Sequence, residues 1–126
     1  MLLDTNAFLW FVRNDPRLSR PALEAISNRD NEVRLSPASY WEIGIKVQLG
    51  KYRLNMPLAG FIEKAIELYG FTILPIEPRH AEVVAKLPPH HRDPFDRLLI
   101  AQAMVEGLTV ISADAAMDAY SITRLW

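Results

Sequence analysis

The chain alternates short apolar runs with longer segments that carry helix signals. Four runs have the length and composition of buried strands, and we expect a fifth strand at the end: Met1–Leu3, Val33–Leu35, Phe71–Leu74, Leu108–Ile111 and Ser121–Trp126. Strands that alternate with helices build an α/β layer fold, because parallel neighbours need a helical crossover between them. The sequence therefore predicts an α/β fold with a mainly parallel central sheet.

Residues that begin and end helices define the segments between these runs. A Ser or Asp before a proline is typical of a helix start, and a glycine is typical of a helix end. By these signals we expect helices over Ala7–Arg13, from Ser19 with Leu23 and Ile26 turned inward, over Ser36–Gly50 and Asn55–Gly70, from Pro78, and over Asp93–Gly107.

Length and composition exclude several classes of protein. A chain of 126 residues fits one domain, residues 1–126, and its formal net charge of −1 excludes binding of polyanions by bulk charge alone. There is no cysteine, which excludes disulfides, thiolate zinc sites and cysteine nucleophiles. No apolar run reaches the roughly 18 residues of a membrane span, and no leader pattern is present. We expect a cytoplasmic protein without membrane contact.

Two acidic residues follow predicted strands. Asp4 comes directly after Met1–Leu3, and Asp114 follows Leu108–Ile111 by way of Ser112. Ligands of open α/β sheets bind beyond the carboxyl ends of the strands, which is where both acids are expected. Each acid alone also has a simpler interpretation, as the cap of the helix that follows it.

Two further acids lie on predicted helices. Glu42 belongs to a narrow polar stripe of an otherwise apolar helix, which suits either a cleft or an exposed ion pair with Lys46. Asp96 heads the last long helix, where Asp93 is the better N-cap. Clustered carboxylates without Cys or His ligands suit Mg²⁺ or Mn²⁺, which activate water at phosphate esters.

Four motifs resemble those of the PIN domain family and, within it, the VapC-type toxins of type II toxin–antitoxin pairs. They are Leu2-Leu3-Asp4-Thr5-Asn6-Ala7, Ser39-Tyr40-Trp41-Glu42-Ile43, Arg92-Asp93-Pro94-Phe95-Asp96-Arg97-Leu98-Leu99-Ile100-Ala101-Gln102-Ala103 and Ser112-Ala113-Asp114. Together they span nearly the whole chain, and the third is the most specific. Asn6 is a departure, since many close relatives have His at this position.

The resemblance implies a PIN-like three-layer sandwich with the activity of a Mg²⁺- or Mn²⁺-dependent endoribonuclease. Such a toxin hydrolyses RNA phosphodiester bonds with a metal-activated water, forms a homodimer and is neutralised by a cognate VapB-type antitoxin. The resemblance implies that the catalytic, metal-ligating acids are Asp4, Glu42, Asp96 and Asp114. It implies that the residues orienting these carboxylates or water are Thr5, Asn6, Ser112 and Asp93.

Other charged and aromatic residues have less specific interpretations. The cations available to hold RNA are Arg13, Lys46, Arg92 and Arg97, and each is equally an ordinary solvated charge. We interpret His90 and His91 as surface histidines of a proline-rich loop rather than as ligands. Four aromatic residues are expected in the core or at an interface: Trp10, Phe11, Trp41 and Trp126.

Two alternative functions stay open. An aspartate-dependent phosphohydrolase also places an Asp after its first strand, but it uses a second Asp two residues later, where this chain has Asn6. A non-catalytic PIN-like interaction domain would use the same acids as caps and ion pairs. Metal-dependent cleavage of single-stranded RNA, compared with hydrolysis of a nitrophenyl phosphate, distinguishes these functions.

Overall fold

In the computed structural model, which describes residues 1–126, a pair of α-helices follows each of the first three of five strands. In chain order they are β1 (Leu2–Leu3), α1 (Thr5–Val12), α2 (Arg20–Ser27), β2 (Arg34–Leu35), α3 (Pro37–Gln48), α4 (Leu58–Tyr69), β3 (Thr72–Ile73), α5 (Pro78–Lys86), α6 (Pro94–Glu106), β4 (Val110–Ile111), a 3₁₀ helix η1 (Ala115–Ala119) and β5 (Arg124–Leu125). This order confirms the predicted α/β class.

The strands form one sheet in the order β3-β2-β1-β4-β5, and every neighbouring pair is parallel. β1 has two residues, like the other strands, and it is the central strand. Leu2 aligns with Arg34 of β2 on one side and with Val110 of β4 on the other. The residue that follows β1 therefore lies at the middle of the sheet edge.

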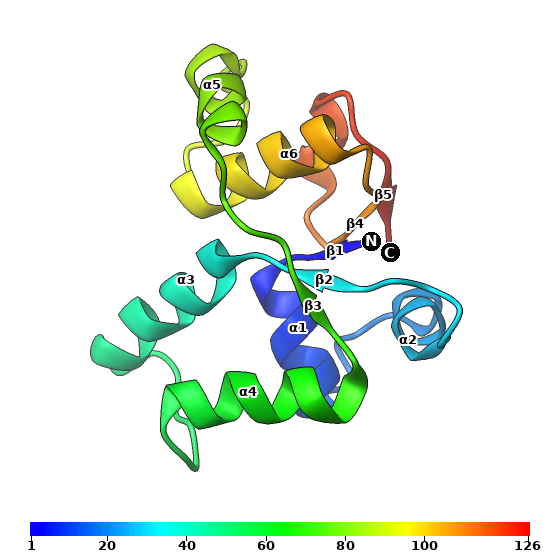
Figure 1. Cartoon of the computed structure of the whole chain (residues 1–126), viewed down its shortest axis with the longest axis vertical. Coiled ribbons are helices and arrows are strands. Elements are labelled where there is room, and N and C mark those ends of the chain that lie inside the picture. The colour runs from blue at the N-terminus through cyan, green and yellow to red at the C-terminus, as the bar shows by residue number, and fades with distance from the viewer.

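Successive residues of β1 face opposite layers of helices, as the two-residue period of a strand requires. Leu3 packs in a core with residues of α1, α2, α3 and α4, among them Phe8, Ile43 and Phe61. Leu2 packs in a second core that includes Leu99 of α6. Helices thus cover both faces of the sheet, with α5 and α6 on one face and α1 and α4 on the other (Figure 1). The predicted three-layer sandwich is confirmed.

Helix ends follow the capping residues that the sequence contains. The side chain of Ser36 accepts a hydrogen bond from the Ala38 amide at the start of α3, and Gly107 ends α6 with a φ of 65°. The sequence placed Leu23 inward, and this was wrong, because Leu23 is 43% exposed. An eight-residue helix has a narrow inner face, which in α2 is formed by Ala22 and Ile26.

The aromatic residues divide between the interior and the surface. Trp10 and Trp126 pack against each other, with ring centroids 5.6 Å apart, and Phe11 packs against Tyr69. Trp41 does not belong to the core, since it is 63% exposed on α3. No helix combines the length and the apolar character that crossing a membrane needs.

Candidate functional site

Two of the four candidate acids lie at neighbouring strand ends. Asp4 directly follows β1, and Asp114 follows β4 after two further residues. Because β1 and β4 are parallel neighbours, their carboxyl ends lie at the same sheet edge, where α1 leaves β1 (Figure 1). Both carboxylates also cap the helices that follow, since Asp4 Oδ1 accepts from the Ala7 amide at 2.7 Å and Asp114 Oδ1 from the Ala116 amide at 3.0 Å.

Glu42 approaches this edge from α3 and is buried. Its Oε1 accepts a hydrogen bond from the Thr5 hydroxyl at 2.6 Å, and its Oε2 lies 2.7 Å from Lys46 Nζ. The ion pair with Lys46 that the sequence offered as an alternative is therefore present, but it is not an exposed pair. Thr5 directly follows Asp4, so this hydrogen bond ties α3 to the end of the central strand.

The fourth acid, Asp96, lies in the first turn of α6, and Asp93 is the cap of that helix. Asp93 Oδ1 accepts hydrogen bonds from the amides of Phe95 and Asp96 at 2.8 and 3.3 Å. The side chain of Asp96 makes no hydrogen bond with the protein and lies 4.0 Å from His91 Nε2. Asp93 therefore has the capping role, which leaves Asp96 free for another.

The charges of the other acids contribute to the raised pKa values of Asp4 and Asp96, after burial. Burial raises the pKa of Asp4 to about 6, with contributions from the charges of Glu42 and Asp114, while hydrogen bonds from Ser112 and Ala7 oppose the rise. Burial also raises the pKa of Asp96 to about 7, followed by the charges of Asp93, Asp4 and Glu42, while His91 opposes the rise. The structure thus brings all four acids into one electrostatically coupled group.

The four acids differ in how their charge is balanced. Glu42 is paired with Lys46, and Asp114 contacts the His91 imidazole at 2.6 Å. No lysine or arginine lies within ion-pair distance of Asp4 or Asp96, and His91 Nε2 lies 4.0 Å from Asp96 Oδ2. Two carboxylates consequently face a lysine or a histidine, and the other two have raised pKa values.

The supporting residues named from the sequence have different surroundings. Thr5 and Ser112 are buried against the acids, and Ser112 Oγ also accepts from the Asp114 amide at 3.0 Å. Asn6 is exposed, and its side chain makes no hydrogen bond. The roles predicted for Thr5, Ser112, Asn6 and Asp93 toward metal or water stay predictions.

The four candidate RNA-binding cations are not equally available. Arg97 donates hydrogen bonds to four backbone carbonyls: those of Val84, Leu87, Pro88 and His91. Arg13 donates to the Arg53 carbonyl at 2.8 Å beside a cavity of about 510 Å³ between α1 and α4. Lys46 is paired with Glu42. Arg92 is exposed and forms no ion pair, so it is the most accessible of the four.

The sequence interpretation missed His91. We expected a surface histidine, but the His91 side chain is only 8% exposed. His91, Asp96 and Asp114 each offer one potential metal-binding atom, and these three atoms lie within 4.8 Å of one another. His90 is exposed, in agreement with the prediction. The available signal was position, because His91 directly precedes the most specific motif, which begins at Arg92.

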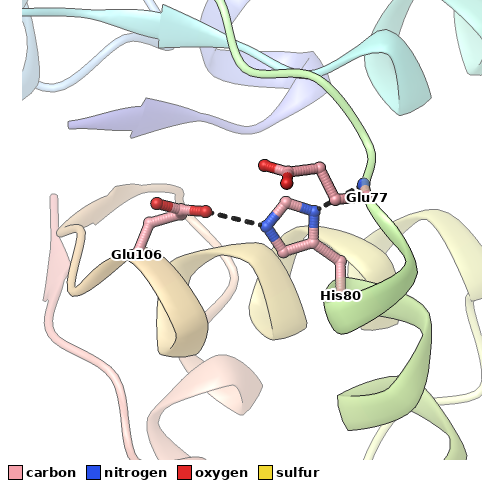
Figure 2. Close-up of side chains that lie close together, drawn as sticks. All are labelled: Glu77, His80 and Glu106. Carbon is pink, nitrogen blue, oxygen red and sulfur yellow. Dashed lines mark hydrogen bonds and ion pairs between the residues drawn. The ribbon is translucent and has the colours of Figure 1, made fainter.

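A second group of acids and a histidine lies between α5 and α6, formed by Glu77, His80 and Glu106 (Figure 2). His80 is buried, and its Nδ1 accepts a hydrogen bond from the Glu77 amide at 2.9 Å. Its proton is therefore on Nε2, which lies 3.0 Å from Glu106 Oε1. Arg79 pairs with both glutamates. Every ring atom that could bind an ion is already hydrogen-bonded, and the group joins α5 to the end of α6.

The chain belongs to the PIN domain family, because the model of this family, PIN domain, matches residues 1–122. It is similar to Ribonuclease VapC22 of Mycobacterium tuberculosis, with 26% identity over 125 residues that cover 98% of this chain and 94% of that protein. Two solved structures share its fold. One is VapBC2 from Rickettsia felis, bound to a DNA fragment from its promoter. Its TM-score is 0.73 and its identity 13%, with 98% of this chain and 96% of that chain covered. FitAcB from Neisseria gonorrhoeae has a TM-score of 0.68 and 23% identity, with 98% and 94% covered.

Proposed function

We propose that this protein is a Mg²⁺- or Mn²⁺-dependent endoribonuclease and the toxin of a type II toxin–antitoxin pair. The observation that carries the proposal is the coupled group of Asp4, Glu42, Asp96 and Asp114, in which the pKa values of Asp4 and Asp96 are raised. A solvent-exposed carboxylate that served only as a helix cap would have its charge stabilised and its pKa lowered, whereas burial and neighbouring acids raise the pKa values of these two. The likeness to Ribonuclease VapC22 supports RNA as the substrate.

The donor atoms in this group fit a hard divalent cation. All four candidate ligands are carboxylates, and Asp4 and Asp96 carry charge that the surrounding side chains do not balance. Oxygen donors of this kind suit Mg²⁺ and Mn²⁺. When bound, such an ion supplies a Lewis acid that activates water and neutralises charge on the phosphodiester.

The residues of the chain divide the remaining work. Asp4 and Asp96 hold the ion, because they are the acids with unbalanced charge. Glu42 and Asp114 complete the carboxylate group, each fixed by its own partner, and Ser112 restrains Asp4. Among the cations, Arg92 is free to contact an RNA phosphate.

The proposed partners are a cognate VapB-type antitoxin and a second copy of this chain. The likeness to VapBC2 supports the antitoxin. An exposed apolar stripe along α3 and its C-cap residue supports a homodimer, because Trp41, Ile45 and Leu49 follow one another at four-residue spacing and are 63%, 38% and 63% exposed. Such a stripe is a surface that a partner would cover.

Cleavage of single-stranded RNA by the purified protein tests the proposal. We expect cleavage with Mg²⁺ or Mn²⁺ and none with excess EDTA. Asp4→Asn and Asp96→Asn should each lower the rate by about 100-fold or more, because a misplaced ion loses both charge and geometry. Asp30→Asn is the matched control, since Asp30 is an exposed aspartate without an ion pair, and it should cleave as the wild type does.

Two results would contradict the proposal. Cleavage that persists in EDTA would exclude the metal, and hydrolysis of a nitrophenyl phosphate without RNA cleavage would favour a phosphohydrolase. Mapping of cellular RNA ends after brief induction, with Asp4→Asn as the control, would then identify the RNA that is cut.

A further inference from the structure

The loop between α5 and α6 places a histidine inside the carboxylate group. His91 Nε2 lies 2.6 Å from Asp114 Oδ2 and 4.0 Å from Asp96 Oδ2, although Asp114 comes 23 residues later in the chain. The side chain is 8% exposed, so the ring is enclosed by the protein. Its contact with Asp114 is consequently a feature of the folded site.

The surroundings of Nδ1, the other ring nitrogen of His91, indicate which of the two nitrogens is protonated. His91 Nδ1 is buried and has no hydrogen-bond partner. A histidine that binds a metal through Nε2 keeps its proton on Nδ1 and donates it to an acceptor, and no acceptor is present here. A buried N–H without a partner is also less favourable than a bare lone pair. We therefore assign the proton to Nε2, which donates it to Asp114.

Several contacts fix the backbone of this loop and hold the ring in place. The His91 amide donates to the Tyr120 hydroxyl at 2.8 Å, and that hydroxyl donates to the Pro88 carbonyl at 3.0 Å. Arg97 donates to the carbonyls of Pro88 and His91 at 3.0 and 3.3 Å. The donor atom at Nε2 is consequently preorganised before any ion or substrate arrives.

Asp114 is the most exposed of the four acids. Its side chain is 40% exposed, and its only other restraint is the Ala116 amide, which contacts Oδ1 in a short 3₁₀ helix. The hydrogen bond from His91 restrains the second oxygen, Oδ2. With both oxygens restrained, the carboxylate keeps one orientation.

We propose that His91 is a positioning residue of the carboxylate site, where its Nε2–H group holds Asp114 in the orientation that binds the divalent ion. This inference rests on the proposed function for the identity of the ion. Partners of this kind usually change metal affinity by about 10–100-fold when they are removed.

Binding of Mn²⁺ to the metal-free protein, measured from the electron paramagnetic resonance signal of free Mn²⁺, tests the inference without RNA. His91→Leu should raise the Kd for Mn²⁺ by about 10–100-fold. His91→Gln should retain most of the affinity, because its amide N–H reaches as far as Nε2. His91→Asn carries the same group one bond shorter and should bind weakly. His90→Leu, in the exposed neighbour, should bind as the wild type does.

The comparison of His91→Gln with His91→Asn still decides the question if His91→Leu does not fold. Equal Kd values for these two variants would overturn the inference, as would wild-type affinity in a folded His91→Leu protein. Nitrogen NMR of the Mg²⁺-loaded protein gives a second readout. We expect a protonated Nε2, and a protonated Nδ1 would make His91 a ligand and overturn the positioning role.

These outcomes are separate from those that test the proposed function. A wild-type protein that binds Mn²⁺ through a His91-dependent site but cleaves no RNA would contradict the proposed ribonuclease and support the inference. RNA cleavage that needs Mg²⁺, in a protein whose affinity for Mn²⁺ is the same in all His91 variants, would do the reverse.

Discussion

Lys46 Nζ lies 2.7 Å from Glu42 Oε2, in an ion pair at the wall of the carboxylate group. The side chains of Lys46 and Glu42 are 30% and 7% exposed. Lys86 and Glu82 form a pair with the same four-residue spacing on α5, with a distance of 2.9 Å, but their side chains are 76% and 68% exposed. The chain therefore contains two pairs of the same type that differ mainly in burial.

Lys46→Met should lower the free energy of unfolding by about 1–3 kcal/mol, because it leaves the buried Glu42 charge without its partner and beside other acids. Lys86→Met should change it by less than about 0.5 kcal/mol, since water screens the exposed pair. Urea unfolding of both variants in EDTA measures the difference. Equal changes would show that burial of Glu42 does not matter for the pair.

Asp96→Asn should leave the stability of the metal-free protein unchanged or raise it, because the substitution removes one of several like charges. Asp93→Ala, three residues earlier, should lower the free energy of unfolding by about 0.5–2 kcal/mol, because it removes the cap of α6. Thermal unfolding in EDTA gives both values. If Asp96→Asn is clearly destabilised, Asp96 is a structural residue and the metal site is wrong.

Mg²⁺ should raise the Tm of the wild-type protein, because an ion that binds only the folded state stabilises it. The Asp96→Asn protein should respond less, since it lacks one of the acids whose charge the ion balances. Melting curves over a series of Mg²⁺ concentrations measure this response. Identical responses of the two proteins would place the ion elsewhere.

The metal-free protein should lose stability as the pH rises from about 4 to 7. The pKa values of Asp4 and Asp96 are raised from 3.8 to about 6 and about 7 in the folded state, so in this range the folded state binds more protons than the unfolded state. Stability supplied by such groups is present below the unfolded pKa and is lost as the pH rises through the folded pKa.

Urea unfolding at several pH values in EDTA measures this dependence. The dependence should be weaker in Asp96→Asn, and saturating Mg²⁺ should weaken it in the wild type by binding the ionised acids. A stability that rises over the same range would mean that these two carboxylates are favourably paired when charged.

Leu49→Glu should shift a homodimer toward monomers, because it places a charge in the apolar stripe of α3. Leu68→Glu on α4 is a matched control, since Leu68 is 60% exposed and Leu49 is 63% exposed. Sedimentation velocity at tens of micromolar protein compares the two variants with the wild type. A wild-type protein that is monomeric under these conditions would contradict the proposed homodimer.

Helix ends marked by a capping residue or a glycine were predicted well, because these signals are local, but α1 begins at Thr5 rather than Ala7 and α4 at Leu58 rather than Asn55. The Asp93-Pro94 start and the Gly107 end enclose α6 as expected, and Ser36 begins α3. The convergence of the acids could be anticipated for Asp4 and Asp114, since both follow parallel strands. The contact of His91 with Asp114 could not, because it depends on how the loop after α5 packs on Tyr120 across the fold.

Because β1 is hydrogen-bonded to a strand on each side, the number of residues between β1 and Asp4 is a constraint on the site. The Arg34 amide donates to the Met1 carbonyl on one side, and the Asp4 amide donates to the Ile111 carbonyl at 3.1 Å on the other. Inserting one residue between Leu3 and Asp4 would turn the carboxylate toward the opposite face of the sheet. A substitution in a surrounding helix leaves this register intact, so the site tolerates it better than a change in the number of residues between this two-residue central strand and Asp4.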